Sequence, residues 1–385
     1  MMLMFSSSPV SPEPQFRSGE NQPIVIGLVN NMPDAALRTT ERQFCALLSV
    51  ASGNIQVCLR LFYLPELPRQ DWGRSFVNQC YENISELWAT HIDGLIVTGT
   101  EPAAAALVDE PYWQTLTKLV DWAEDHTVST IWSCLAAHAA VLHIDGIDRC
   151  ALGGKLSGIF ECTKAADHSL MARAPSRWRV PHSRYNEVPE KALVSKGYRI
   201  LSRSADAGAD MFVKHRRSLF IFFQGHPEYD PGALLREYRR DSRKFLVGER
   251  TNYPEMPRNY FDNDTGTVLA EFRERALRNP SIDLLSSFPA VANEKLAHVW
   301  RELSMATYTN WLSYLVEQRA RNPSPTEIGC LHDGEYGLKS NAKSTSARVS
   351  NVTGSVQSVR GEGGVANEMF SFPRILSVRR GRCSI

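Results

Sequence analysis

The sequence predicts an α/β protein whose doubly wound, mostly parallel sheet is flanked by helices. Two observations carry this prediction. From about residue 24 onward, short apolar runs alternate with stretches in which apolar residues recur at helical spacing, and such alternation favours a parallel sheet. The chain has 385 residues, of which 43% are hydrophobic and 22% charged. These values suit one large α/β domain with additions, or two domains.

The first half of the chain contains the clearest alternation. Strands are predicted at 24–29, 55–61, 94–97 and 129–133. One helix is expected from about Glu41, with Thr40 as its cap and Phe44 on its apolar face. A second is expected over 112–126. Because ligands bind beyond the carboxyl ends of the strands in such a sheet, residues that directly follow a strand are the candidates for a site.

In the second half the pattern changes to short strands, which either extend the sheet or pair antiparallel. They are expected at 177–180, 198–201 and 211–214, and a fully buried strand at 218–223 follows them. Helices are then predicted over 233–246 and 296–318. We expect a single domain over 23–322, after a disordered leader at 1–22. The tail at 323–385, rich in Ser, Gly, Asn and basic residues, is expected to be disordered.

Composition excludes several classes of protein. The formal net charge is +1, which gives no electrostatic argument for binding nucleic acid or a membrane surface. No apolar run approaches the roughly 20 residues of a membrane span. Eight cysteines are scattered without a CxxC pair, which indicates reduced thiols and a cytoplasmic location. No metal-binding constellation is evident, because His138 and His143 lie five apart on a predicted helix, too far round for a ligand pair.

Cys134 is the first candidate for chemistry. It follows the apolar, β-branched run 129–133 and precedes a small-residue stretch that predicts a helix. A sharp break from strand to helix is how hydrolase-like folds present a nucleophile, and the helix N-terminus stabilises a thiolate there. The alternative interpretation is a buried, inert cysteine, which is common after a strand.

His226 and Glu228 provide the partners that a nucleophilic cysteine needs. They follow the buried strand at 218–223, in a tight turn set by Gly225 and Pro227. A cysteine nucleophile needs a base, and the base needs an acid to orient it. Residues two apart in an extended turn project to the same side, so both can face one cleft. The alternative is a loop histidine with an exposed glutamate.

The chain as a whole resembles the homoserine O-succinyltransferase/O-acetyltransferase family, whose core is similar to a class I glutamine amidotransferase. The resemblance covers about residues 24 to 320 and rests on an ordered set of short motifs. These motifs are Asn31-Met32-Pro33, Thr40-Glu41-Arg42-Gln43-Phe44, Asp93-Gly94-Leu95-Ile96-Val97-Thr98-Gly99, Tyr112-Trp113, Cys134 with its Ala-rich helix, Lys155-Leu156-Ser157-Gly158, Pro181-His182-Ser183-Arg184-Tyr185, Gly225-His226-Pro227-Glu228-Tyr229-Asp230, Glu237-Tyr238-Arg239-Arg240-Asp241, Asn259-Tyr260-Phe261 and Thr309-Asn310-Trp311-Leu312.

The resemblance implies a role for each matching residue. The acyl-accepting nucleophile falls on Cys134, the general base on His226 and the orienting glutamate on Glu228. The family's substrate-contacting residues fall on Lys155, Ser183 and Arg240, for which the alternatives are ordinary loop residues and a solvated helix face. An arginine at position 240 suits the carboxylate of homoserine, because a guanidinium binds a carboxylate through two parallel hydrogen bonds.

The sequence also departs from the family pattern. Leu135 replaces the usual tryptophan after the nucleophile, and the Asn-Met-Pro loop lacks its usual lysine, with Arg38 as the nearest cation. The position associated with acyl choice falls on Ala103. Alanine leaves room for a longer acyl chain and cannot repel its carboxylate, which favours succinyl over acetyl. The stretch 263–295 is an atypical insertion.

The predicted enzyme is therefore a homoserine O-succinyltransferase of methionine biosynthesis. It uses succinyl-CoA (or acetyl-CoA) as co-substrate, homoserine as acceptor and no bound cofactor, with the backbone N–H groups of Leu135 and Thr100 holding the oxyanion. The resemblance allows a homodimer. Three alternatives stay open: an acyltransferase that uses acetyl-CoA or serine, an amidotransferase-type glutaminase, and a non-catalytic binding protein.

Overall fold

The computed structural model describes residues 22–292, 296, 298–321 and 376–379. Its centre is one mixed sheet with the strand order β11-β2-β1-β4-β5-β10-β9-β8-β6-β7, and β3 (Glu82–Asn83) pairs with β2. The strands from β11 to β10 run parallel. They comprise β11 (Leu376–Arg379), β2 (Val57–Tyr63), β1 (Ile24–Val29), β4 (Gly94–Val97), β5 (Ser129–Ser133) and β10 (Leu219–Phe223). The predicted strands of the first half are confirmed.

An antiparallel extension completes the sheet beyond β10. It consists of β9 (Gly208–His215), β8 (Arg199–Ser204), β6 (Cys150–Lys164) and β7 (Arg177–Glu187). The predicted short strands are confirmed as members of this extension. The strand β6 was not predicted from the sequence, because its first half carries Gly153, Gly154 and the polar Lys155 in place of an apolar alternation.

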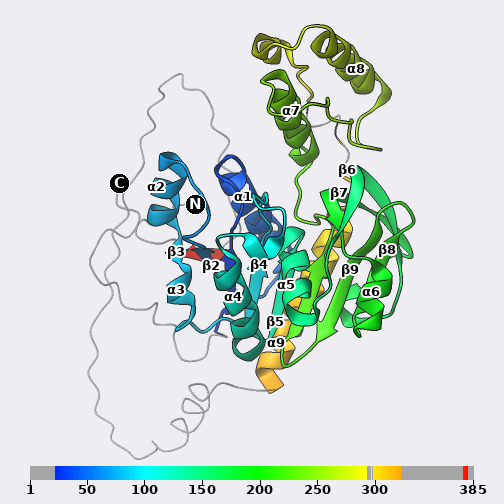
Figure 1. Ribbon diagram of the computed structural model, residues 1–385. Helices are drawn as coiled ribbons and strands as arrows, with labels where there is room; N and C mark the ends of the chain where they lie inside the picture. The colour runs from blue at the N-terminus through cyan, green and yellow to red at the C-terminus, as the bar shows by residue number, and fades with distance from the viewer. Residues whose placement is uncertain (1–21, 293–295, 297, 322–375, 380–385) are drawn as a thin grey trace, which may run out of the picture.

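Helices cover both faces of the sheet, as a doubly wound fold requires. One face carries α1 (Asp34–Ala51), α2 (Asp71–Cys80) and α9 (Arg301–Arg321), whose buried side chains join one apolar core. The other carries α3 (Ile84–Leu87), α4 (Trp113–His126), α5 (Leu135–Asp145) and α6 (Glu190–Ser195). In Figure 1, α4 and α5 lie in front of the sheet and α9 lies behind it.

A helical lobe stands beyond the ends of β6 and β7 (Figure 1). It contains α7 (Ala233–Leu246), α8 (Asn263–Arg278) and the 3-10 turn η3 (Ile282–Ser287), which share a small apolar core around Tyr238 and Phe272. The predicted insertion at 263–295 thus supplies α8 and η3, which pack on α7. Two further 3-10 turns, η1 (Leu107–Asp109) and η2 (Ser169–Met171), lie in loops.

One boundary prediction was wrong. The first helix begins at Asp34 rather than near Glu41, because Pro33 is its cap and Thr40 lies buried inside it; proline is well suited to a helix start. The predicted tail contains β11, which pairs in parallel with β2. The rest of that tail, and the leader up to residue 21, lie outside the described residues. Among the helices that the structure describes, none is long and apolar enough to cross a membrane.

Candidate active site

Cys134 occupies a strained turn between β5 and α5. Its backbone angles are φ 53° and ψ −115°, a region that residues other than glycine rarely adopt. Its N–H donates to the carbonyl of Phe223 at 2.7 Å, and its own carbonyl accepts from His138 N–H at 3.2 Å. The thiol is partly exposed at the N-terminus of α5. The predicted strand-to-helix break is therefore present, and it holds the sulfur above the end of the sheet.

The predicted base and its orienting acid lie in the turn that follows the neighbouring strand. The strand β10 pairs with β5, with Phe223 opposite Ser133, so the turn after β10 lies beside Cys134. His226 Nδ1 is 2.9 Å from an oxygen of Glu228, and both residues are buried. The imidazole of His226 is within hydrogen-bonding reach of Cys134, and among the described residues its Nε2 atom has no other partner. That buried nitrogen is the atom available for proton transfer.

The electrostatics of this turn favour a protonated imidazole. Burial has the largest effect on the pKa of His226 and lowers it, but the charges of Glu228 and Cys134 outweigh burial and raise that pKa well above its ordinary value. An imidazolium next to a cysteine stabilises the thiolate, which is the nucleophilic form. The arrangement is suited to a thiolate–imidazolium pair.

A backbone donor for an oxyanion lies beside the sulfur. Leu135 N–H starts α5, and the loop after β4 approaches it so closely that a Cβ atom added to Gly99 would lie 3.0 Å from Leu135 N. Thr98, at the start of that loop, accepts a 2.8 Å hydrogen bond from Asn31 N–H. The Asn-Met-Pro loop, the turn of Thr100 and the Cys134 turn therefore meet at one edge of the sheet.

The three predicted substrate-contacting residues gather around two acidic residues of α7. Lys155 Nζ lies 3.0 Å from Glu237 and 2.7 Å from Asp241, and Ser183 Oγ donates to Glu237. Arg240 is bound to Asp241 at 3.1 Å. Glu237 and Asp241 belong to a motif of the resemblance, but they were given no role from the sequence. Their signal was spacing, because residues three and four apart share one face of a helix.

Tyr229 connects this polar cluster to the turn that carries His226. Its ring stacks on His226 with centroids 4.2 Å apart, and its hydroxyl donates to Glu237. Burial alone would raise the pKa of Glu237, but the charges of Lys155 and Arg240 and the hydrogen bonds from Ser183 and Tyr229 lower it to about 2. Glu237 is therefore a carboxylate at neutral pH, next to the turn that carries His226.

The other residues singled out from the sequence lie on separate elements. Ala103 is exposed on the loop that follows β4, and the same loop is tied to α7 by an ion pair between Glu101 and Lys244. Arg38 packs its guanidinium over the rings of Trp72 and Phe76, 5.2 and 4.4 Å from their centroids. His138 is buried and bonded to Gln224 at 3.0 Å.

Comparison with known proteins decides the family. A family model described as homoserine O-succinyltransferase matches residues 10–322. A relative of that name from Rhodopseudomonas palustris is 48% identical over 305 residues, which cover 78% of this chain and 91% of the relative. The chain belongs to the homoserine O-succinyltransferase family. A relative from Bradyrhizobium japonicum with the same name is 46% identical over 300 residues, covering 76% of this chain and 90% of the relative.

Membership of the homoserine O-succinyltransferase family confirms the predicted enzyme class, an acyltransferase of methionine biosynthesis. The family implies homoserine and succinyl-CoA as substrates. Among solved structures, a glutamine amidotransferase from Methylobacillus flagellatus matches at a TM-score of 0.43 and 15% identity, covering 76% of this chain and 94% of that one. Another from Thermotoga maritima matches at a TM-score of 0.42 and 11% identity, covering 77% and 99%.

Proposed function

We propose that the protein transfers the succinyl group of succinyl-CoA to the hydroxyl of homoserine through a thioester on Cys134. One observation carries the assignment of the residues. A cysteine in a strained turn at a helix N-terminus lies within hydrogen-bonding reach of His226, whose Nδ1 is held by the buried Glu228. Nucleophile, base and orienting acid are the three parts that covalent acyl transfer needs.

In the first half-reaction, the Cys134 thiolate attacks the thioester carbonyl of succinyl-CoA. Leu135 N–H, with a second N–H from the Gly99–Thr100 turn, stabilises the oxyanion. The carbon–sulfur bond to coenzyme A breaks, and the leaving thiolate takes the proton from His226 Nε2. The products are succinyl-Cys134, free coenzyme A and a neutral imidazole.

In the second half-reaction, the neutral His226 removes the proton of the homoserine hydroxyl while its oxygen attacks the acyl-cysteine. Collapse of the tetrahedral intermediate breaks the bond to sulfur and releases O-succinylhomoserine. The thiolate of Cys134 and the imidazolium of His226 are thereby restored. Glu228 holds the imidazole in the tautomer that has Nε2 free for this exchange and stabilises its charge.

The polar cluster on α7 is suited to the two charged ends of homoserine. Arg240 is partly exposed and offers a planar pair of donors to the carboxylate, with Lys155 adding positive charge. Glu237 is ionised and accepts hydrogen bonds from Ser183 and Tyr229, so its carboxylate can receive the substrate ammonium. We therefore add Glu237 to the substrate-binding residues. Ala103 favours succinyl over acetyl because it leaves space and brings no negative charge.

The test is coenzyme A release by the purified chain with each pair of substrates. We expect succinyl-CoA with homoserine to give the highest kcat/KM, above acetyl-CoA with homoserine and above succinyl-CoA with serine. A higher value for acetyl-CoA would contradict the donor assigned from Ala103. Ammonia release from glutamine, measured in parallel, would favour the glutaminase. The cytoplasmic location and the homodimer stay predictions.

A further inference from the structure

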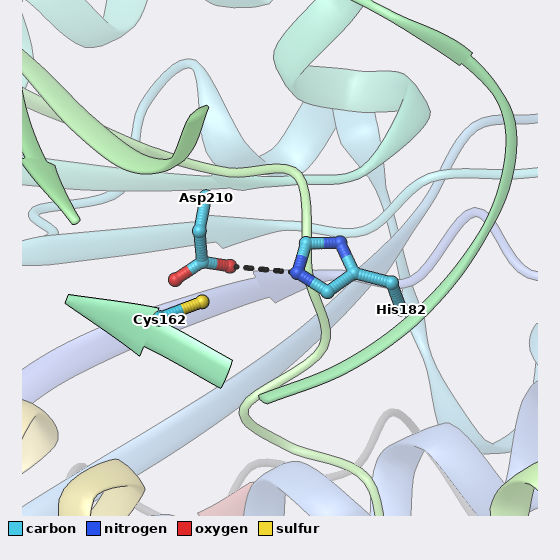
Figure 2. Close-up of side chains that lie close together, drawn as sticks. All are labelled: Cys162, His182 and Asp210. Atoms are coloured by element: carbon cyan, nitrogen blue, oxygen red, sulfur yellow. Dashed lines mark ion pairs between the residues drawn. The ribbon is translucent and has the colours of Figure 1, made fainter. Parts of the chain in front are cut away.

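Three side chains of metal-binding type meet inside the antiparallel half of the sheet. Cys162 lies on β6, His182 on β7 and Asp210 on β9, and Figure 2 shows the three pointing toward one another. A sulfur, a ring nitrogen and a carboxylate oxygen from this cluster all lie within 4.8 Å of one another. All three residues are buried, with exposed fractions of 0%, 0% and 3%. None of them has a role in the acyl transfer described above.

The polar atoms of this cluster lack the partners that buried groups ordinarily have. Among the described residues, neither ring nitrogen of His182 makes a hydrogen bond, and Oδ1 of Asp210 makes none. The polar contact between these groups is the 3.3 Å approach of His182 Nε2 to Asp210 Oδ1, which Figure 2 marks as an ion pair, and Nδ1 of His182 has no such contact among the described residues. Buried polar atoms without a partner call for an explanation such as a bound ion or water.

We propose that Cys162, His182 and Asp210 bind one divalent transition-metal ion, and that Zn²⁺ fits the donor set best. Thiolate, imidazole and carboxylate are the ligands that zinc takes in proteins. At bond lengths of about 2.0–2.3 Å, ligand atoms in a tetrahedral site lie roughly 3.3–3.8 Å apart, a spacing that small side-chain movements reach from the observed cluster. The two anionic ligands would balance the charge of the ion. A divalent ion would replace the proton of the Cys162 thiol, because metal binding releases protons from thiol ligands.

The surroundings of the cluster support this assignment. Ser202 Oγ donates to Oδ2 of Asp210 at 2.6 Å, so the carboxylate is held with Oδ1 turned toward His182, as second-shell hydrogen bonds hold ligands in metal sites. A cavity of about 20 Å³, lined by Asp210 and Ser202 among mostly apolar side chains, lies on the Asp210 side of the cluster. It has the volume of one water molecule.

The ion would lie directly beneath the catalytic turn. A Cβ atom added to Gly225 would lie 2.5 Å from Oδ1 of Asp210 and 3.0 Å from Nε2 of His182. Gly225 immediately precedes the general base His226 in the chain. The proposed site is thus structural, and it supports the backbone that carries the base without contacting the substrates.

The test is a Co²⁺ titration of the full chain, freed of metal with a chelator, in a Cys134→Ala background. That background removes the catalytic thiol, so the result does not depend on the proposed acyl transfer. We expect one equivalent of Co²⁺ to bind with sulfur-to-cobalt charge-transfer absorption, and Zn²⁺ to displace it. Adding Cys162→Ser should abolish that absorption and weaken binding at least about tenfold. Adding Cys45→Ser, a buried cysteine on α1, should change neither.

Absence of the absorption in the parent, or its persistence in the Cys162→Ser variant, would overturn the proposal. If Cys162→Ser fails to fold by circular dichroism, Ser202→Ala takes its place. This change keeps all three ligands and removes only the hydrogen bond that orients Asp210. We expect it to weaken Co²⁺ binding roughly tenfold. An unchanged affinity in Ser202→Ala would equally rule the site out.

Discussion

Cys134 is held in its strained conformation by bonds on both sides of the turn. Its N–H is fixed to β10 through Phe223, and its carbonyl accepts the first hydrogen bond of α5. Strain of this kind persists only where the surrounding structure determines it, and such positions are concentrated at functional sites. The same two contacts bring the sulfur beside the turn that carries His226. The geometry of a single residue thereby joins the two segments that carry the proposed catalytic residues.

The charge of Glu228 is predicted to be essential for the action of His226. We expect Glu228→Gln to lower kcat by on the order of 10² or more, because the imidazole loses its orienting acid. Since the carboxylate raises the pKa of His226, its loss should move any limb of the pH–rate profile governed by His226 to lower pH. Steady-state kinetics against pH measure both effects. The control is Glu249→Gln, which removes an exposed carboxylate just after α7. It should leave the pH–rate profile unchanged.

Gly99 is predicted to keep the oxyanion donor accessible. In Gly99→Ala the new methyl would lie 3.0 Å from Leu135 N and would crowd the position where the oxyanion forms. Losing one such donor costs about 10²–10³ in rate, and we expect a loss of kcat of that order with little change in thermal stability. Gly154→Ala is the matched control, because its added methyl meets nothing within 4 Å. Equal activity of the two variants would contradict the oxyanion assignment.

The positions of the candidate catalytic residues could be predicted where the residues closely follow an apolar strand. Cys134, His226 and Glu228 stand at such strand ends, and the structure brings them together. Their roles remain predictions. The cluster of Cys162, His182 and Asp210 could not be found in this way. Its three residues lie on three different strands and are 20 and 28 positions apart in the sequence. Only the pairing of the antiparallel strands brings them together.

At the scale of elements, Gly158 lets a distant segment dock on β6. Its φ is +144°, and an added Cβ would lie 2.4 Å from the carbonyl oxygen of Arg258. Ile159 N–H donates to that carbonyl at 2.8 Å, and Arg258 N–H donates to Ser157 at 2.9 Å. This docking anchors the segment that joins α7 to α8. The Lys-Leu-Ser-Gly motif therefore has a structural role beside that of Lys155.

We expect Gly158→Ala to destabilise the protein by roughly 1–3 kcal/mol, because alanine is strained at that φ and clashes with the backbone of Arg258. Thermal unfolding of purified protein measures the change. Gly153→Ala on the same strand has open space around its new methyl, and it should fall within about 0.5 kcal/mol of the parent. Similar melting temperatures for the two variants would show that the docking is not tight.

Elements with strong periodicity were predictable, and those with mixed composition were not. The charged helix at 233–246 is found with those bounds as α7, because its apolar residues keep helical spacing. The strand β6 was missed, since its side chains alternate neither in polarity nor in burial over its first half. Its position depends on pairing with β7, a contact between distant parts of the chain that local pattern does not encode.

At the scale of the whole molecule, the ionised Glu237 is predicted to make stability sensitive to acid. Its pKa falls from 4.5 to about 2 in the folded state. A depressed pKa contributes stability that is present above about pH 4.5 and lost as the pH falls toward 2. The shift corresponds to about 3 kcal/mol. We expect the melting temperature of Glu237→Gln to fall less steeply than that of the parent as the pH is lowered through this window.

The control for this prediction is Glu255→Gln, which removes an exposed carboxylate near the same lobe. Its melting temperature should follow the parent at every pH. An identical pH dependence of the parent and Glu237→Gln would mean that Lys155 and Ser183 do not stabilise the carboxylate as the geometry indicates.

The class of the whole fold could be predicted, but its full extent could not. Alternating strands and helices identified the parallel, doubly wound half, which the structure confirms. The same pattern left open whether the short strands of the second half extend the sheet or pair antiparallel. The structure shows that they do both, from β9 to β7. That half also supplies Lys155 and Ser183, so the topology determines which side chains complete the site.

The most direct test of Cys134 as the nucleophile is intact-protein mass spectrometry after brief mixing with succinyl-CoA and no acceptor. We expect an adduct of succinyl mass on the parent chain, no adduct on Cys134→Ala, and loss of the adduct when homoserine is added. A succinyl adduct that persists in Cys134→Ala, or turnover by that variant, would contradict the assignment of Cys134 as the nucleophile.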